Sequence, residues 1–288
     1  MTALTPAVVR RDRFARVRAI GGGWLVWLSV VVLVAFVVAA ALAPVLAPYD
    51  PDTTDLSNVL APPSSAHWLG TDQVGRDTYS RMLFGARTSL VGPLVVVVAA
   101  TVLGVVLGLV AGWRGGWTDT LLSRLFDIVF AFPALLLAIL AVSLFGKGLV
   151  APVVAMAIAY TPFVARQVRG LVQTARTRPY VAAYAVQGTG PVDVAVRRVL
   201  PNLAPLILAQ ATVMFGYALL DLAALSFLGL GVQPPTPDWG AMINDSRGAV
   251  LLGEPLTAVV PSVAVIVTVI AFNVLGEDLA DRIARRDG

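Results

Sequence analysis

Few residues in this sequence could carry out chemistry. None of the 288 residues is cysteine, and His67 is the single histidine. Thiol catalysis, disulfide bonds and a metal site built on histidine and cysteine therefore do not fit. Asp221 is the one acid well inside an apolar run, where a carboxylate is by default a functional hypothesis. Because no second titratable residue lies nearby in sequence, a hydrogen bond between helices explains it equally well, and no catalytic residue, cofactor or metal is predicted.

Nucleotide hydrolysis is not indicated either. The phosphate-binding loop G-x-x-x-x-G-K-[ST] needs glycines that let the backbone approach a phosphate, followed by Lys and a hydroxyl side chain. The nearest stretch, Gly146-Lys147-Gly148, lacks both the upstream glycine and the following Ser or Thr. We therefore predict that this chain is not an enzyme.

The elements that must position these residues are membrane helices. Hydrophobic residues make up 58% of the chain and charged residues 13%, against about 25% charged residues in ordinary soluble domains. A helix needs about 20 apolar residues to cross a bilayer. Six such runs occur, at residues 24–47, 90–112, 121–145, 149–165, 203–225 and 256–275. The sequence predicts an all-α polytopic membrane protein with six transmembrane helices.

Basic residues predict the orientation. With the N-terminus in the cytoplasm, 16 of the 21 Lys and Arg residues fall on the cytoplasmic side, so both termini are predicted there. Because the arginines follow this topology, they form no contiguous basic face of the kind that binds nucleic acid. A cleavable signal peptide ending at Ala41-Leu42-Ala43 is the alternative for the first run. That run exceeds the about 7–15 apolar residues of signal peptides, so a retained helix is favoured.

This topology divides the chain into four segments, the last of which contains two long loops. Residues 48–88 and 226–255 are predicted to be external, and Trp239 in the second of them could anchor at the membrane interface. Residues 166–202 form an unusually long cytoplasmic connection. The remaining segments are a cytoplasmic tail at 1–23, the first helix at 24–47 and a core at 89–288 that contains the other five helices and both later loops.

Two patterns concern contacts between helices. Small residues at four-residue spacing form one flat helix face that lets another helix approach closely, and we predict such a packing seam in the second span. The seam residues are Ala100, Gly104, Gly108 and Gly112. Arg124 and Asp127 are three residues apart and share a helix face, so we expect them to pair or to extend toward the membrane surface.

The long cytoplasmic segment predicts a helix–turn–helix. An Ala-rich run from Ala182 favours a short helix, and Gly188 can end it by adopting positive φ. Gly190-Pro191 follows as a turn, and Asp193 could open a second helix, which is expected to end at Leu200-Pro201. An exposed apolar stripe on this element indicates a docking site for a soluble partner.

The spacing of this segment resembles the EAA loop of ABC-importer permeases: E-A-A, three residues, G, nine residues, I, one residue, L-P. Two positions depart from that pattern, since Ala182 replaces the family's Glu and Arg198 occupies the slot two before Leu-Pro. The resemblance implies coupling to an ATPase through Ala182, Ala183, Gly188, Asp193, Arg197, Arg198, Leu200 and Pro201.

Further stretches resemble the peptide/nickel branch of this family, specifically the second, C-type permease subunit. They are Leu69-Gly70-Thr71-Asp72 with Gly75-Arg76-Asp77, the run from Arg81 to Leu90, Ala131-Phe132-Pro133 with the run from Leu135 to Ile139, the run from Leu225 to Gly231 leading to Trp239-Gly240, and Asn273, Gly276, Asp278, Leu279 and Asp281. The family usually places an acid at the position of Leu222. Here the carboxylate is at Asp221, about 100° around the helix.

The resemblance implies a type I ABC-importer architecture in the inner membrane of a bacterium. The expected partners are a second homologous permease in a heterodimer, two ABC ATPase subunits, a periplasmic or lipid-anchored solute-binding protein, and membrane lipid. The expected substrates are di- and oligopeptides, with Asp221 as a candidate contact on the translocation path. Nickel or another small solute is the alternative cargo. An ion-coupled secondary transporter is the alternative class, although such proteins typically show inverted repeats and several intramembrane charges.

Overall fold

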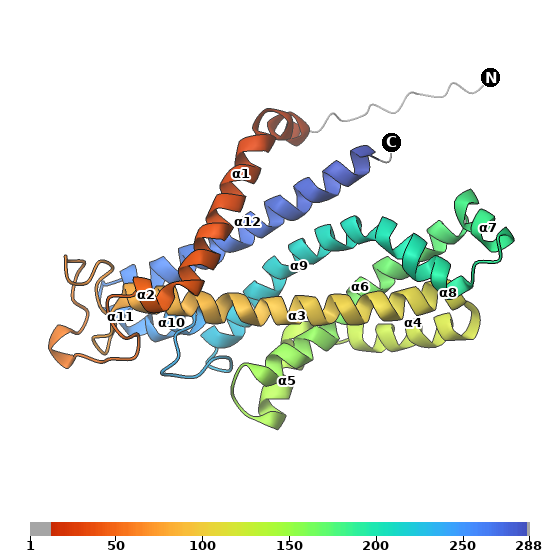
Figure 1. Ribbon diagram of the computed structural model, residues 1–288. Coiled ribbons are helices and arrows are strands. Elements are labelled where there is room, and N and C mark those ends of the chain that lie inside the picture. Colours follow the sequence, from red (N-terminus) through yellow and green to blue (C-terminus); the bar gives the residue numbers. More distant parts are fainter. Residues whose placement is uncertain (1–12, 287–288) are drawn as a thin grey trace, which may run out of the picture.

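The structure is a computed structural model that describes residues 13–286 (Figure 1). The first 12 residues of the expected cytoplasmic tail, with Arg10 and Arg11, lie outside the described residues. Helices account for every regular element in the described part of the chain. They are α1 (Arg13–Ala41), α2 (Ala43–Leu46), the 3-10 turn η1 (Leu56–Asn58), α3 (Thr78–Arg114), α4 (Gly116–Phe130), α5 (Ala134–Phe145), α6 (Val150–Arg176), α7 (Pro179–Val186), α8 (Pro191–Val194), the π-helical turn η2 (Ala195–Val199), α9 (Leu200–Phe227), α10 (Trp239–Asp245), α11 (Arg247–Leu251) and α12 (Leu256–Arg286).

Five helices are long and apolar enough to cross a membrane, and the bent pair α4–α5 makes up to six. This confirms the prediction of a multi-pass helical protein, but the third expected span is not one continuous helix. It bends by 78° between α4 and α5, at Ala131-Phe132-Pro133. Pro133 has no backbone N–H to donate, and its ring disfavours a helical conformation at Phe132. The proline therefore breaks the span.

Helices α3, α6 and α9 form the centre of the molecule. The buried core along them includes Val96, Met156, Val168, Leu219 and Leu225. In Figure 1, α1 and α12 lie on one side of α3 and the bent pair α4–α5 on the other. Large apolar side chains remain exposed on the outer helices, such as Trp27, Phe145 and Ile270, as expected for surfaces that meet lipid or a partner helix.

Two central helices extend beyond the apolar runs that predict them. α3 begins twelve residues before its expected span because Asp77 caps it: the Ser80 N–H donates to Asp77 Oδ2 at 2.8 Å. α6 continues to Arg176, so the first part of the expected cytoplasmic segment 166–202 is helix rather than connection.

One end of the molecule, the end expected to be external, is covered by residues 48–77 together with α10 and α11 (Figure 1). The expectation that Trp239 anchors at the membrane interface is wrong. Its side chain is fully buried, its Nε1–H donates to the Met82 carbonyl at 3.2 Å, and its ring meets Phe36 edge-on at 5.4 Å between centroids. Because α3 and α1 supply both the acceptor and the apolar surface, Trp239 joins the external helices to the bundle.

Candidate functional site

The turn after α7, which is expected to be cytoplasmic, has the backbone geometry that its sequence predicts. Gly188 has φ +77°, and the Thr189 N–H donates to the Tyr184 carbonyl at 3.1 Å, which closes the end of the helix. Gly190 then leads into α8, with Pro191 in its first turn, where the missing proline N–H costs nothing. The turn therefore presents residues 187–191 at the end of a short, regular helix.

The second cytoplasmic helix does not end at Leu200-Pro201, contrary to expectation. α8, η2 and α9 form one continuous helical span, Pro191–Phe227. The Leu200 N–H donates to the Ala195 carbonyl, an i to i−5 bond. This wider π-helical turn accommodates the missing N–H of Pro201 without breaking the helix. Asp193, Arg197, Arg198, Leu200 and Pro201, five of the residues expected to couple to an ATPase, are consequently part of the same helix as the fifth membrane span, whereas Ala182, Ala183 and Gly188 precede it.

The charged residues of this segment contact one another. Arg197 Nη1 lies 2.9 Å from Asp193 Oδ1 one turn earlier. The guanidinium of Arg198 lies over the Tyr184 ring at 4.9 Å, so the residue that departs from the family pattern joins η2 to α7. Ala182 and Ala183 are exposed, and so are the apolar side chains Val186 and Val192, at 89% and 71%.

A hollow of about 370 Å³ lies beside the turn. Its walls come from the end of α3 and from the chain between α7 and α8. They are Trp113, Val181, Gly188, Thr189, Gly190, Pro191 and Val194. This end of the molecule thus combines an exposed apolar surface with a concavity next to it.

The small residues of α3 lie against α6. Ala100 is fully buried, and a Cβ placed on Gly104 would lie 2.5 Å from Val164 Cβ. A Cβ on Gly108 would lie 2.5 Å from the Ala165 carbonyl oxygen, and one on Gly112 would lie 2.8 Å from that of Arg169. Only residues without a Cβ permit this approach, so the spacing fixes the two backbones against each other.

Two ion pairs join α4 to α6 at the cytoplasmic end of the seam. Arg169 Nη2 donates to Asp119 Oδ2 at 2.7 Å. Asp127 pairs with Arg166, whose guanidinium also lies over the Phe130 ring at 4.3 Å. The expected pairing of Asp127 with Arg124 is therefore wrong, because α6 brings a guanidinium from another helix to the same carboxylate.

Asp221 also has a partner on another helix. Tyr160 Oη on α6 donates to Asp221 Oδ2 on α9 at 2.8 Å, and both side chains are half-buried. An intramembrane carboxylate that accepts a hydrogen bond across a helix interface stabilises that interface. Its neighbour Leu222, at the position where the family usually has an acid, is buried.

Comparison with known proteins decides the class. Residues 104–286 match the family model described as the binding-protein-dependent transport system inner membrane component. Residues 24–63 match the N-terminal transmembrane domain of oligopeptide transport permease C. The chain belongs to the binding-protein-dependent transport permeases.

Similarity to curated relatives covers most of this permease. The chain is 39% identical over 253 residues to the dipeptide transport system permease protein DppC of Alkalihalophilus pseudofirmus, and the alignment covers 88% of this chain and 83% of the relative. It is 39% identical to the glutathione transport system permease protein GsiD of Escherichia coli O6:K15:H31, with 86% and 82% covered. For GsiD of Pectobacterium atrosepticum the identity is 40%, with 82% and 78% covered.

These similarities place the permease among multi-pass proteins of the bacterial inner membrane. It is a subunit of an ABC importer of the peptide type, and it is a transport protein rather than an enzyme. The comparisons favour this class over an ion-coupled secondary transporter. Members of the family work with a second permease, ATPases and a binding protein.

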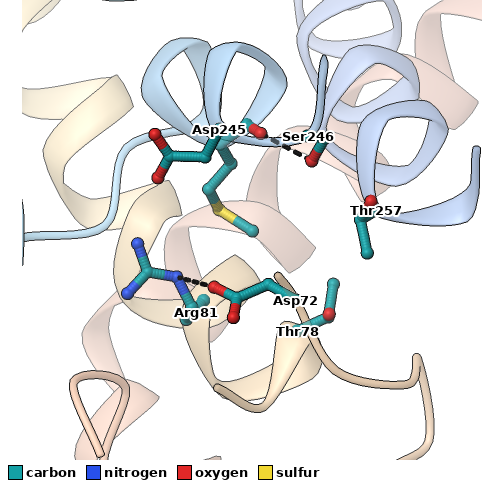
Figure 2. A pocket seen from close by; sticks show the side chains of 7 residues that line it. Asp72, Thr78, Arg81, Asp245, Ser246 and Thr257 are labelled. Atoms are coloured by element: carbon teal, nitrogen blue, oxygen red, sulfur yellow. Dashed lines mark hydrogen bonds and ion pairs between the residues drawn. The ribbon is translucent and has the colours of Figure 1, made fainter. Parts of the chain in front are cut away.

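Sequence reasoning missed an ionic cluster at the opposite end of the permease, around the start of α3. Arg81 is 2% exposed, its Nη1 donates to the Pro51 carbonyl at 2.9 Å, and its Nε lies 3.7 Å from Asp72 Oδ2. Figure 2 shows the Arg81 guanidinium directed at Asp72, with Asp245 across the small pocket that they line. Arg76 pairs with Asp72 at 2.6 Å and reaches Asp245 at 3.5 Å. The signal in the sequence was that Arg76 and Arg81 fall in a segment predicted to lie outside the cytoplasm. Basic residues are uncommon there, so a specific ionic partner should have been expected.

Other polar residues fix α3 to the external layer. His67 Nδ1 lies 2.9 Å from Asp77 Oδ1, so the single histidine orients the cap of α3. Ser89 Oγ donates to Asp238 Oδ2 at 2.8 Å and accepts from the Trp239 N–H at 2.9 Å. Burial raises the pKa of the Asp238 carboxyl, although these hydrogen bonds oppose the shift. Within residues 13–286 no group of three or more His, Cys, Asp or Glu side chains could hold a metal ion.

Proposed function

We propose that this chain forms the substrate path of a peptide importer together with a second, homologous permease in a heterodimer. Two ABC ATPase subunits drive the cycle from the cytoplasmic side, and a periplasmic or lipid-anchored solute-binding protein delivers di- or oligopeptides to the external side. The observation that carries this proposal is the exposed cytoplasmic turn at Gly188 within a chain of this family.

The turn suits docking to another protein. Val186 and Val192 expose most of their apolar surface to the aqueous side, where burial against a partner stabilises a complex by about 25 cal/mol per Å² of apolar area. The coupling residues are Ala182, Ala183, Gly188, Asp193, Arg197, Arg198, Leu200 and Pro201. Since the last five of them, from Asp193 to Pro201, lie on the helix that continues into α9, movement of a docked ATPase displaces a membrane helix without an intervening joint.

The substrate assignment rests on the relatives. The two most informative names are those of a dipeptide permease and a glutathione permease, and both substrates are short peptides. Nickel complexes and other small solutes are the alternative cargo. Asp221, hydrogen-bonded to Tyr160, is a candidate contact on the path.

The orientation with both termini in the cytoplasm belongs to the same proposal. It places α7, α8 and the 16 predicted cytoplasmic basic residues on the side of the ATPases. It places the ionic cluster of Arg76 and Arg81, with α10 and α11, on the side of the binding protein.

Reconstitution tests the proposal. The chain is purified with a partner permease, ATPases and a binding protein of the same organism, and placed in proteoliposomes with radiolabelled trialanine. We expect uptake that requires both ATP and the binding protein, and no ATP hydrolysis by this chain alone. Uptake driven by an ion gradient without ATP would contradict the proposal, as would ATP hydrolysis by the isolated chain that is lost when the chain is mutated.

A further inference from the structure

A hollow of about 390 Å³ lies between α6 and α9, on the cytoplasmic side of the Tyr160–Asp221 hydrogen bond. The residues that line it come only from these two helices. They are Val164, Arg166, Gln167, Val168, Gly170, Leu171, Leu206, Ile207 and Gln210. The hollow is mostly apolar, with two neutral amides and one guanidinium on its walls.

Gln210 is unusual for a membrane helix, because it lies inside the expected fifth span at residues 203–225, whereas Gln167 lies just past the expected fourth span, beside Arg166. Gln167 is exposed and Gln210 is half-buried, and among the described residues neither side chain has a hydrogen-bond partner. Polar side chains within membrane spans almost always face a bundle interior or a water-filled cavity, because lipid offers them no hydrogen bonds. Pro205 lies inside α9 at this level, and Figure 1 shows α9 as an arch rather than a straight rod.

The hollow continues the seam that carries Asp221. Tyr160 and Gln167 are seven residues apart on α6, and Gln210 and Asp221 are eleven apart on α9. Both separations are close to whole numbers of helical turns, so each pair shares one face of its helix. The facing sides of α6 and α9 therefore carry the Tyr160–Asp221 hydrogen bond at one level and the two amides at the hollow, with apolar side chains such as Val164 and Met214 between them.

We infer that this hollow is a substrate-contacting part of the translocation path, in which the amides of Gln167 and Gln210 bind the backbone amide groups of a peptide in transit. The inference rests on the proposed function and names the chemistry of its site. A primary amide offers two donors and a carbonyl acceptor, which match the C=O and N–H of a peptide unit. The apolar walls accept side chains without selecting among them. Arg166 pairs with Asp127 and also lines the hollow. Its guanidinium can therefore bind the carboxylate of a peptide as well.

The first test removes the amides from the complete reconstituted transporter. The probes are trialanine and a trialanine analogue whose backbone nitrogens are N-methylated and cannot donate. The variants are Gln167→Leu, Gln210→Leu and their combination, with Thr212→Val as the control. Thr212 also lies on α9, but its hydroxyl donates to the Leu208 carbonyl of its own helix.

We expect wild type to import trialanine faster than the methylated analogue. Each Gln→Leu change should raise the KM for trialanine by about fivefold, which corresponds to one hydrogen bond, and reduce the discrimination between the two peptides. Because the binding protein is the same in every sample, a change in discrimination reports on the permease. Equal discrimination in wild type and the double variant would overturn the inference. If wild type imports neither peptide, the proposed function is wrong, and the inference that rests on it falls with it.

A second test asks whether the hollow is open to water. The chain contains no cysteine, so Gln167→Cys and Gln210→Cys each introduce one thiol into it. We expect a membrane-impermeant methanethiosulfonate reagent to label this chain from the cytoplasmic side, and trialanine to slow the labelling in the complete transporter. Absence of labelling with and without ATP would show that a helix of the partner permease fills the hollow, and would overturn the inference.

Discussion

Tyr160 on α6 and Asp221 on α9 are joined by a hydrogen bond of 2.8 Å, and this is how the permease accommodates the one acid well inside its fifth apolar run. The pair links two central helices of the bundle.

Tyr160→Phe should destabilise the permease, because it removes the only donor that the structure gives to the Asp221 side chain. A hydrogen bond to a charged group contributes about 1.5–3 kcal/mol, so the melting temperature of the detergent-solubilised chain should fall. Tyr217→Phe is the matched control, because Tyr217 lies on α9 four residues before Asp221 and its side chain is exposed. Equal melting temperatures for the two variants would show that the bond contributes nothing to the fold.

Gly188→Val should uncouple the permease from its ATPases. A β-branched residue at φ +77° is a conformational outlier, so the turn must rearrange while the membrane helices stay untouched. Gly190→Val is the control, because both glycines have open space around a Cβ but Gly190 does not have positive φ. Co-purification of the ATPases and peptide uptake are measured. A normal complex and full uptake in Gly188→Val would show that the loop is an ordinary connection.

Gly108→Ala should destabilise the α3–α6 seam. The new Cβ would lie 2.5 Å from the Ala165 carbonyl oxygen, so one of the two backbones must shift, at a cost of about 1–3 kcal/mol. Gly170→Ala in α6 meets nothing within 4 Å and should be neutral or stabilising by about 0.5–1 kcal/mol. Thermal unfolding of both variants checks the prediction, which fails if Gly108→Ala melts at or above the wild-type temperature.

The stability of the external layer should depend on Asp238 ionisation. Because burial raises the pKa of the folded carboxyl, the folded state binds a proton more tightly than the unfolded chain does. The wild-type free energy of unfolding therefore falls as pH rises from about 3.9, the unfolded pKa, to the raised folded pKa, and is constant above it. Asp238→Asn has no such dependence, so its advantage in melting temperature over wild type should grow with pH and then level off.

Asp55→Asn gives the opposite sign and serves as the control. Hydrogen bonds from Ser57 and Asn58 lower the pKa of the Asp55 carboxyl, so the ionised form stabilises the folded state above the unfolded pKa. That stabilisation is lost as pH falls through the lowered pKa of the folded carboxyl. A difference between Asp238→Asn and wild type that stays the same at every pH would contradict the prediction for Asp238.

Topology reporters should place both termini in the cytoplasm. A reporter enzyme active only outside the cytoplasm should be silent when fused after Gly288 and active when inserted near Asn58, which lies in the external segment after α1. The expectation follows from 16 of 21 basic residues on the cytoplasmic side. The reverse pattern of activity would overturn the orientation.

Local patterns predicted the parts of the structure that depend on nearby residues. Apolar run length predicted the membrane helices, and Gly188 was expected at positive φ because only glycine adopts it without strain. Small residues at four-residue spacing predicted a close helix contact, although the partner, α6, could not be read from α3 alone.

Features that depend on distant residues could not be predicted in this way. Asp127 pairs with Arg166 rather than Arg124 because α6 passes beside α4. Trp239 is buried because α10 packs against α1 and α3. Pro133 bends one span and Pro201 does not interrupt another, and only the surrounding hydrogen bonds, including the i to i−5 bond of Leu200, distinguish the two cases.

The unbroken helix Pro191–Phe227 joins the proposed docking turn directly to Gln210 and Asp221 of the proposed path. At 1.5 Å per residue, Gln210 lies roughly 28 Å and Asp221 roughly 45 Å from Pro191 along the axis. A tilt of about 10° at the cytoplasmic end would therefore move Gln210 by roughly 5 Å and Asp221 by roughly 8 Å, by the same geometry. The same small rotation would therefore displace Asp221 farther than Gln210. Movement of docked ATPases would then open the proposed path more widely near Asp221 than at the hollow.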